Sequence, residues 1–320
     1  MMLPRSNINM ILRQYRLSGQ TVTHAQFKRD FLNYASRDNF IAWADAFLED
    51  QKISGLMSEQ TYKNKKNRLK HFSEFANKQV LFAELTPQLI SQFDLYLRKK
   101  SGLKKHNSIQ SIHVGIKTFI KVAIAEGVNV DNPYDKFKIK PYQPGNRISL
   151  DKLELSRLKI LYSKKELPEL EQETLRKFLF SCYTGIRISD SARLRYENID
   201  DGFLKMETFK TRRFGKNVNI ALPDFAKQLL GDGNWGLIFK TIADQTVNKA
   251  LKEIAIKAEI NKRLTFHVSR DTFATFFIEL GGDVASLKEL LAITKTETAM
   301  IYVKMSEKRK ETLMKNFNKI

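Results

Sequence analysis

The sequence contains a single cysteine among 320 residues, so it can form no internal disulfide and no zinc site built from several cysteines. That residue, Cys182, lies in an apolar run, which favours a packed core thiol. No apolar run approaches the roughly 18 residues needed to cross a bilayer, and no secretory signal peptide is recognisable. These absences predict a cytoplasmic protein with no membrane partner.

Acidic residues are scarce relative to basic ones, since 35 Asp and Glu face 55 Lys and Arg and leave a formal net charge of +20. A solvated lysine-rich surface is one interpretation, but such surfaces usually carry balancing acids. The excess favours a polyanionic partner, nucleic acid above all. The sequence also lacks a P-loop and any acidic cluster suited to Mg²⁺, so we expect neither a nucleotide nor a metal cofactor.

The chain does contain enough apolar material for two folded domains, with 42% hydrophobic residues and 22 Phe. Residues 1–37 are too short for a core of their own and are interpreted as an N-terminal remnant. Across residues 38–127 the apolar positions recur with helical spacing and show no strand pattern. This pattern predicts a small helical bundle. Its helices are expected near residues 39–48, 58–75, 86–102 and 108–126.

Residues 128–149 contain Pro133, Pro141 and Pro144 among several cations, a composition typical of a linker. Residues 150–320 form the second predicted domain, which is mainly α-helical with one small β-hairpin. The hairpin strands are expected at residues 203–209 and 217–222. The helices are expected near residues 150–162, 168–183, 223–230, 243–258, 267–280, 284–291, 297–303 and 307–316.

Two groups of cations are candidates for contacts with DNA phosphates. The first lies on the predicted helix 58–75, with no acid between its members, and consists of Lys63, Lys65, Lys66, Arg68 and Lys70. A solvated outer face is the alternative for this group. The second lies in the hairpin loop and consists of Arg212, Arg213 and Lys216.

Three residue types in the second half of the chain suit chemistry on a phosphate diester. His267 and Arg270 are three residues apart and share one face of a helix, and Tyr302 follows on a later helix. Arg187 lies in the stretch 184–190 (Thr-Gly-Ile-Arg-Ile-Ser-Asp), in a turn between two helices. Taken singly, each has an ordinary alternative: a surface arginine, a core histidine or a half-buried tyrosine.

Taken together and in this order, with Lys210-Thr211 on the hairpin between them, these motifs resemble the tyrosine recombinases, or phage-type integrases. The nearest members are integrases of bacterial conjugative transposons and prophages, and the resemblance covers residues 39–320. It implies a two-domain clamp around double-stranded DNA, made of a SAM-like helical core-binding domain and a catalytic domain. It also implies site-specific recombination through a 3′-phosphotyrosine, without ATP or metal, to integrate or excise a mobile element.

The chemistry gives each residue type a role. Two guanidiniums, Arg187 and Arg270, suit the charge that gathers on a phosphate in the transition state. Tyr302 is the candidate nucleophile, with His267 as its base or as a donor to the phosphate. Lys210 is the candidate acid that protonates the departing 5′-oxygen, although the neighbouring cations of the loop compete for that role.

Three positions concern the fit to the family. Asp190 lies where the family often has an acid, and we interpret it as a group that orients an arginine. Nine residues before Tyr302 the family usually has His or Trp, but Ile293 cannot donate a hydrogen bond to the phosphate. Asp271 replaces a common His after Arg270. A degenerate recombinase fold that only binds DNA is therefore the alternative function.

The resemblance implies further partners and a location. We expect dimers and tetramers on DNA, held together by a basic C-terminal helix at residues 306–319. Accessory DNA-bending or excision factors and a location at the bacterial nucleoid are also implied. Residues 1–37 resemble at most the tail of the arm-binding domain that many relatives carry. The target sequence and the direction of the reaction do not follow from the sequence.

Overall fold

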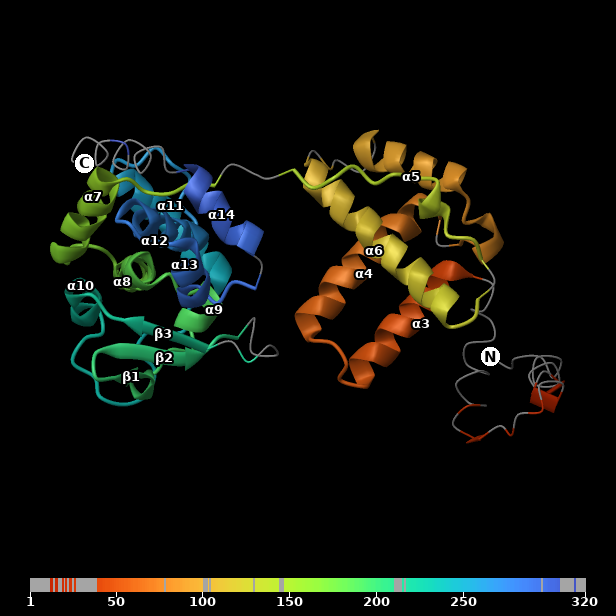
Figure 1. Ribbon diagram of the computed structural model, residues 1–320, viewed down its shortest axis with the longest axis horizontal. Coiled ribbons are helices and arrows are strands. Elements are labelled where there is room, and N and C mark those ends of the chain that lie inside the picture. Colours follow the sequence, from red (N-terminus) through yellow and green to blue (C-terminus); the bar gives the residue numbers. More distant parts are fainter. Residues whose placement is uncertain are drawn as a thin grey trace. The chain divides into compact units, whose positions relative to one another are not determined.

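The computed structural model describes residues 39–305 apart from residues 78, 100–102, 104, 129, 144–146, 210–214, 216 and 295. Scattered positions before residue 39 and Met314 are also described, while the side chains of residues 304 and 305 are not. The chain divides into two compact units, residues 1–145 and 146–320 (Figure 1).

The first unit is a helical bundle, as predicted. Its described helices are α3 (Phe40–Ile53), α4 (Glu59–Phe75), α5 (Pro87–Lys99) and α6 (His106–Ala125), with short 3₁₀ turns at Phe82–Glu84 and Pro133–Asp135. Aromatic side chains fill the centre: the ring of Phe72 meets those of Phe40 and Phe93 edge to face, with centroids 5.6 and 4.8 Å apart. The predicted cap of α5 is present, because the hydroxyl of Thr86 accepts a hydrogen bond from the Leu89 N–H at 3.2 Å.

The Pro-containing segment 128–149 contributes to both units. Tyr134 is buried in the bundle core, and its hydroxyl lies 3.1 Å from Nδ1 of His113. Phe137 packs against the same core. Leu150, directly after the segment, is buried in the second unit and donates its N–H to the hydroxyl of Thr272.

The second unit is helical around a small sheet, as predicted. Its helices are α7 (Lys152–Ser163), α8 (Glu169–Thr184), α9 (Ile188–Ser191), α10 (Asp224–Gln228), α11 (Asp244–Lys257), α12 (Phe266–Glu279), α13 (Val284–Leu290) and α14 (Thr296–Met305). The strands β1 (Ile199–Asp200), β2 (Phe203–Glu207) and β3 (Asn217–Ala221) form an antiparallel sheet in that order. The short α9, β1 and the 3₁₀ turn Tyr196–Asn198 were not predicted, because two to four residues carry too little periodicity. The helix predicted at 307–316 lies outside the described residues, apart from Met314.

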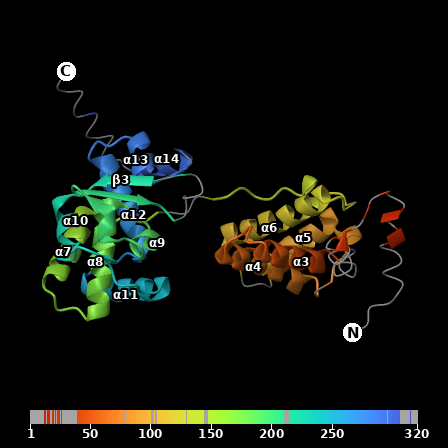
Figure 2. The ribbon, with the colours of Figure 1, turned by 90° about the horizontal axis from the view of Figure 1, so that it is seen from below.

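Helices α8 and α12 cross at the centre of the second unit (Figures 1 and 2). Small hydroxyl residues at the crossing allow a close approach, and the hydroxyls of Ser181 and Ser269 lie 2.7 Å apart in the core. A separate small apolar cluster joins α12, α13 and α14 and includes Ile278, Leu287 and Tyr302. Among the described residues, no helix is long and apolar enough to span a membrane.

Candidate active site

Arg187 is placed by a tight turn between α8 and α9. Gly185 ends α8 in the left-handed conformation, with φ of +67°, and its N–H donates to the Ser181 carbonyl. A Cβ at this position would lie 2.4 Å from the side chain of Leu291, so an alanine here would be strained both by its backbone conformation and by this contact. Two residues later, Arg187 is the N-terminal cap residue of α9.

Arg270 projects from α12 toward the same turn. The side chain is 6% exposed, and its Nη1 donates to the Gly185 carbonyl at 2.6 Å. Its Nη2 donates to the carbonyl of Leu291, just after α13. Burial and the neighbouring Arg187 lower the pKa of Arg270 to about 9, so the guanidinium still carries its charge at neutral pH.

The two guanidiniums are neighbours. Arg187 Nη2 lies 3.3 Å from the same Leu291 carbonyl oxygen that accepts from Arg270, and 3.4 Å from the Ala292 carbonyl oxygen. Ala292 offers its carbonyl from a left-handed backbone conformation, with φ of +45°. Arg187 Nη1 is buried and makes no hydrogen bond among the described residues, although it forms an ion pair of 3.7 Å with Asp190 Oδ2. Two like charges side by side, one with a buried unused donor, form a site suited to an anion.

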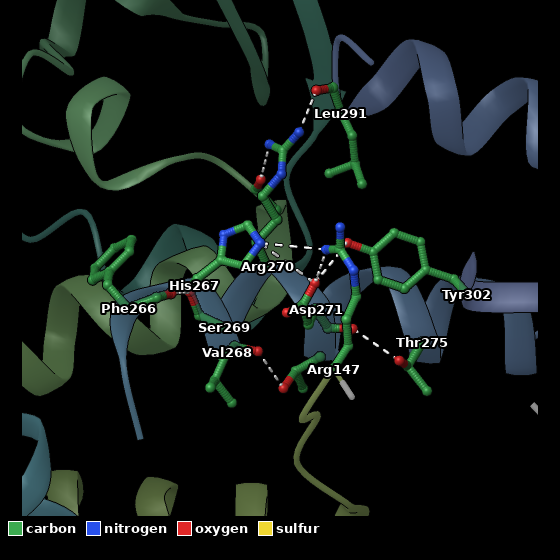
Figure 3. A network of polar contacts seen from close by, with 12 residues as sticks. Arg147, Phe266, His267, Val268, Ser269, Arg270, Asp271, Thr275, Leu291 and Tyr302 are labelled. Carbon is green, nitrogen blue, oxygen red and sulfur yellow. Dashed lines mark hydrogen bonds and ion pairs between the residues drawn. The ribbon is translucent and has the colours of Figure 1, made fainter. Parts of the chain in front are cut away.

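Tyr302 lies beside this pair, fully buried at 1% exposure, on α14. Its hydroxyl donates to Oδ1 of Asp271 at 2.6 Å. Arg147 Nη1 donates to the same Asp271 oxygen at 2.7 Å and lies 2.8 Å from the Tyr302 hydroxyl oxygen (Figure 3). Burial and the Asp271 carboxylate raise the pKa of Tyr302, so the phenol is protonated in this state.

His267 lies at the open side of the network. Its side chain is 62% exposed, and its Nε2 is 3.3 Å from Arg147 Nη1 and 3.7 Å from Asp271 Oδ1. Desolvation and the nearby guanidiniums lower the pKa of His267, although Asp271 acts in the opposite direction. The neutral imidazole therefore touches Arg147 and faces Asp271, while the carboxylate of Asp271 contacts the phenol directly.

Asp190 connects the Arg187 turn to the hairpin. The carboxylate is 2% exposed, lies 3.7 Å from Arg187 Nη1 and accepts a hydrogen bond from the Phe209 N–H at 2.9 Å. Phe209 directly precedes Lys210 in the chain. The predicted residues Lys210, Arg212, Arg213 and Lys216 themselves lie outside the described residues.

The cations of α4 divide into two groups. Lys66 pairs with Asp45 and Glu49 of α3, at 2.9 and 3.7 Å, and so links the two helices. Lys63 and Lys70 form ion pairs of 3.6 and 3.7 Å with acids four residues away, Glu59 and Glu74. No ion pair is seen for Lys65 or Arg68 within the described part of the bundle.

Arg68 lies at a polar groove of about 740 Å³ that residues of α4 and α6 line. Asn64, Asn67, Asn107 and Gln110 also line it. Gly115 of α6 leaves space for the Arg68 stem, because a Cβ there would lie 2.6 Å from Arg68 Cδ. Amides and arginine are the side chains that read base edges in the major groove of DNA.

Two family models match this chain and decide its family. One, described as a phage integrase SAM-like domain, matches residues 39–139. The other, described as the phage integrase family, matches residues 158–309. The chain belongs to the phage integrase family of tyrosine recombinases. The resemblance derived from the motifs is thereby confirmed.

Known proteins agree with this assignment of the recombinase. The tyrosine recombinase XerC of Leptospira interrogans is 24% identical over 294 residues, which span 85% of this chain and 92% of the relative. A tyrosine recombinase of Thermosipho africanus is 27% identical over 267 residues, spanning 79% and 91%. In fold, the recombinase is similar to lambda integrase in a tetramer bound to a Holliday junction, with a TM-score of 0.66, 16% identity, and coverage of 93% of this chain and 85% of that one.

Two features separate the recombinase from the family pattern. Ile293 is 8% exposed and belongs to the apolar cluster around Tyr302. At the position where the family usually has His or Trp, this chain therefore has an apolar side chain that packs in the core. Arg147, one of the unnamed cations of segment 128–149 in the sequence analysis, also belongs to the site. No spacing rule could have found it, because 124 residues separate it from Asp271.

Proposed function

We infer that the chain is a site-specific DNA recombinase that cleaves and rejoins double-stranded DNA through a 3′-phosphotyrosine at Tyr302. The observation that carries this proposal is the pair Arg187 and Arg270, which share the Leu291 carbonyl and leave one buried N–H group unused. A phosphate between them would gain charge-assisted hydrogen bonds from both. The same guanidiniums would stabilise the charge that develops in the transition state.

The remaining roles follow from the chemistry. The phenol oxygen of Tyr302 attacks the scissile phosphorus, the bond to the 5′-oxygen breaks, and the energy of the phosphodiester is kept in the new bond. Lys210 is proposed as the acid that protonates the leaving 5′-oxygen. Neutral His267, at the exposed edge, is proposed as a donor to a phosphate oxygen. Asp190 is proposed to orient Arg187 and to fix the start of the loop that carries Lys210.

The helical bundle is proposed as a second DNA contact, through the groove between α4 and α6 and the cation Arg68. The loop cations Arg212, Arg213 and Lys216 are proposed as phosphate contacts. By analogy with lambda integrase, solved as a dimer and as a tetramer on DNA, we propose assembly on DNA through the C-terminal segment 306–319. Accessory factors and a cytoplasmic, nucleoid-associated location are part of the same proposal.

The test uses DNA duplexes from the sequence flanking the gene, each with a nick beside the bond to be cleaved. The nick lets the short 5′ product diffuse away and traps the protein on the DNA. We expect a covalent protein–DNA band on a denaturing gel, absent from Tyr302→Phe. Arg187→Lys should reduce the band by about 10²-fold or more, because a lysine cannot reproduce the two-pronged contact.

Glu279→Gln, at the far end of α12, is the matched control and should leave the band unchanged. Specific binding of a duplex without any covalent band would contradict the proposal. That result would favour the degenerate DNA-binding protein, which the apolar Ile293 position also suits.

A further inference from the structure

The phenol of Tyr302 needs a proton acceptor, and the structure contains one that the family pattern does not supply. As the phenol oxygen bonds to phosphorus it becomes an ester oxygen, which cannot keep its proton. The proton must therefore pass to a neighbouring group during the attack. Two groups among the described residues of the site are able to take it: the imidazole of His267 and the carboxylate of Asp271.

The contacts distinguish these two candidates. The hydroxyl of Tyr302 donates to Asp271 Oδ1 at 2.6 Å, within the range of a short charge-assisted bond. The imidazole of His267 is turned instead toward Arg147, 3.3 Å from Nη1 (Figure 3). The phenol and the carboxylate are both shielded from solvent, at 1% and 4% exposure, so no bulk water competes for the proton.

We propose that Asp271 is the general base of the cleavage step and that Arg147 is a positioning residue for it. This proposal rests on the proposed function, because it names the acceptor for the same nucleophile. In the step, Tyr302 Oη bonds to the scissile phosphorus, its proton passes to Asp271 Oδ1, and the bond from phosphorus to the 5′-oxygen breaks. The leaving oxygen takes a proton from the acid, and both transfers reverse on rejoining.

A carboxylate is a weak base for a free phenol but a sufficient one here. Protein kinases use an aspartate in the same way, to accept the proton of a hydroxyl that attacks phosphorus. The acidity of the attacking oxygen rises as its bond to phosphorus forms, so the transfer becomes favourable late in the step. Before DNA binds, the raised pKa of Tyr302 keeps the phenol protonated and unreactive.

Arg147 explains why the carboxylate stays in place. Its Nη1 contacts both Asp271 Oδ1 and the Tyr302 hydroxyl oxygen, and its guanidinium lies 5.2 Å from the centre of the Tyr302 ring. This arrangement fixes the rotamers of both partners and places a positive charge where negative charge develops on the phenol oxygen. The charged and titratable groups facing the carboxylate are therefore Arg147, His267 and Tyr302, with Arg270 and Arg187 behind them.

The experiment compares the rate of covalent-complex formation on the nicked duplex for the wild type and Asp271→Asn. Asparagine keeps a hydrogen-bond acceptor of the same shape, so folding and DNA affinity should be preserved, but it cannot take up the proton. We expect cleavage to slow by about 10²- to 10⁴-fold. A cleavage rate for Asp271→Asn equal to or above that of the wild type would overturn the proposal, and would show that the carboxylate only restrains the tyrosine.

Two further variants sharpen the result. Asp271→His supplies a proton acceptor whose unperturbed pKa is about 6.5. The cleavage rate of Asp271→His should exceed that of Asp271→Asn at pH 8 and should fall as the pH drops below about 6.5. A cleavage rate that does not fall at low pH would count against a base at this position. On a duplex with sulfur as the bridging 5′ atom, which leaves without a proton, Lys210→Ala should be rescued and Asp271→Asn should stay slow.

The controls separate this inference from the proposed function. A covalent band in the wild type that disappears in Tyr302→Phe establishes the nucleophile, and only then does the Asp271→Asn rate test the base. No band in the wild type on a duplex that it binds specifically would overturn the proposed function and this inference together. A band in the wild type with equal rates in both proteins would overturn this inference alone.

Discussion

Replacing Gly185 by alanine is the sharpest test of how the two guanidiniums are held. The residue has φ of +67°, where an alanine costs about 1–2 kcal/mol. The added Cβ would meet Leu291 at 2.4 Å and Phe273 at 2.6 Å, and such overpacking costs about 1–3 kcal/mol. The free energy of unfolding of the second unit, residues 146–320, which we call the catalytic unit, should therefore fall by about 2–5 kcal/mol. The hydrogen bonds from Arg270 to the carbonyls of Gly185 and Leu291 should also be disturbed.

The single cysteine supplies the assay. Cys182 is 3% exposed in the core of the catalytic unit, at a pocket that Tyr183 and Phe273 also line, so a thiol reagent too bulky for that pocket reaches it only when the unit opens. At about 1.4 kcal/mol per factor of ten, the labelling rate of Gly185→Ala under native conditions should rise by roughly 30- to 5,000-fold. Gly236→Ala, at φ of +84° with open space around it, isolates the backbone cost and should raise the rate by only about 5- to 30-fold. Equal labelling rates for Gly185→Ala and the wild type would refute the packing argument.

Three further predictions test other parts of the structure. Burial lowers the pKa of His113, with Asp94 acting in the opposite direction, so the folded bundle favours the neutral imidazole. That stability is complete above the unfolded-state pKa of about 6.5 and is lost as pH falls below it. The urea midpoint followed by Trp43 fluorescence in a Trp235→Phe background should therefore drop between pH 7.5 and 5.5, and His113→Gln should show a smaller drop. On the DNA side, Arg68→Ala should reduce the slope of log affinity against log salt by about 0.9, whereas Lys66→Ala should leave the slope unchanged because Lys66 is paired with Asp45 and Glu49. Binding titrations of any duplex at salt concentrations of 50–200 mM measure the slopes of both variants. A smaller slope for Lys66→Ala than for the wild type would contradict the conclusion that Lys66 is engaged within the bundle. Asp190→Ala leaves the Phe209 N–H without its acceptor and should destabilise the catalytic unit by about 1–3 kcal/mol in the Cys182 assay. Asp190→Asn keeps a hydrogen-bond acceptor for the Phe209 N–H and should lose less than half as much stability as Asp190→Ala. Equal losses of stability in the two variants would show that the charge of Asp190 matters more than this hydrogen bond.

The local structure of this protein was largely predictable from its sequence. The helices of the bundle and of the catalytic unit follow apolar stripes with helical spacing, and their ends carry explicit signals, such as the Thr86 cap of α5 and Gly185 at the end of α8. Each of these signals acts over a few residues. The sequence motifs also predicted which residue types form the candidate site, because the chemistry of a phosphate diester restricts them strongly.

The bundle cations show where local reasoning stops. Lys63, Lys65, Lys66, Arg68 and Lys70 look alike along the chain, with no acid between them. Folding brings α3 against α4 and places Asp45 and Glu49 beside Lys66, while the Arg68 stem lies over Gly115 of α6. Which cation is already paired depends on helices that the sequence of α4 does not describe.

The contacts within the candidate active site also depended on the tertiary structure. The sequence by itself determined the two-part organisation, the helical class and the identity of the candidate nucleophile and guanidiniums, since all of these depend on composition, periodicity and short motifs. Only the tertiary structure brought Arg147 to Asp271, 124 positions further along the chain, and to Tyr302, another 31 positions after Asp271. Hydrogen bonds require donors and acceptors within about 3 Å, and the packing of α12, α13 and α14 into one apolar cluster brings Tyr302 to α12, the helix that carries Asp271.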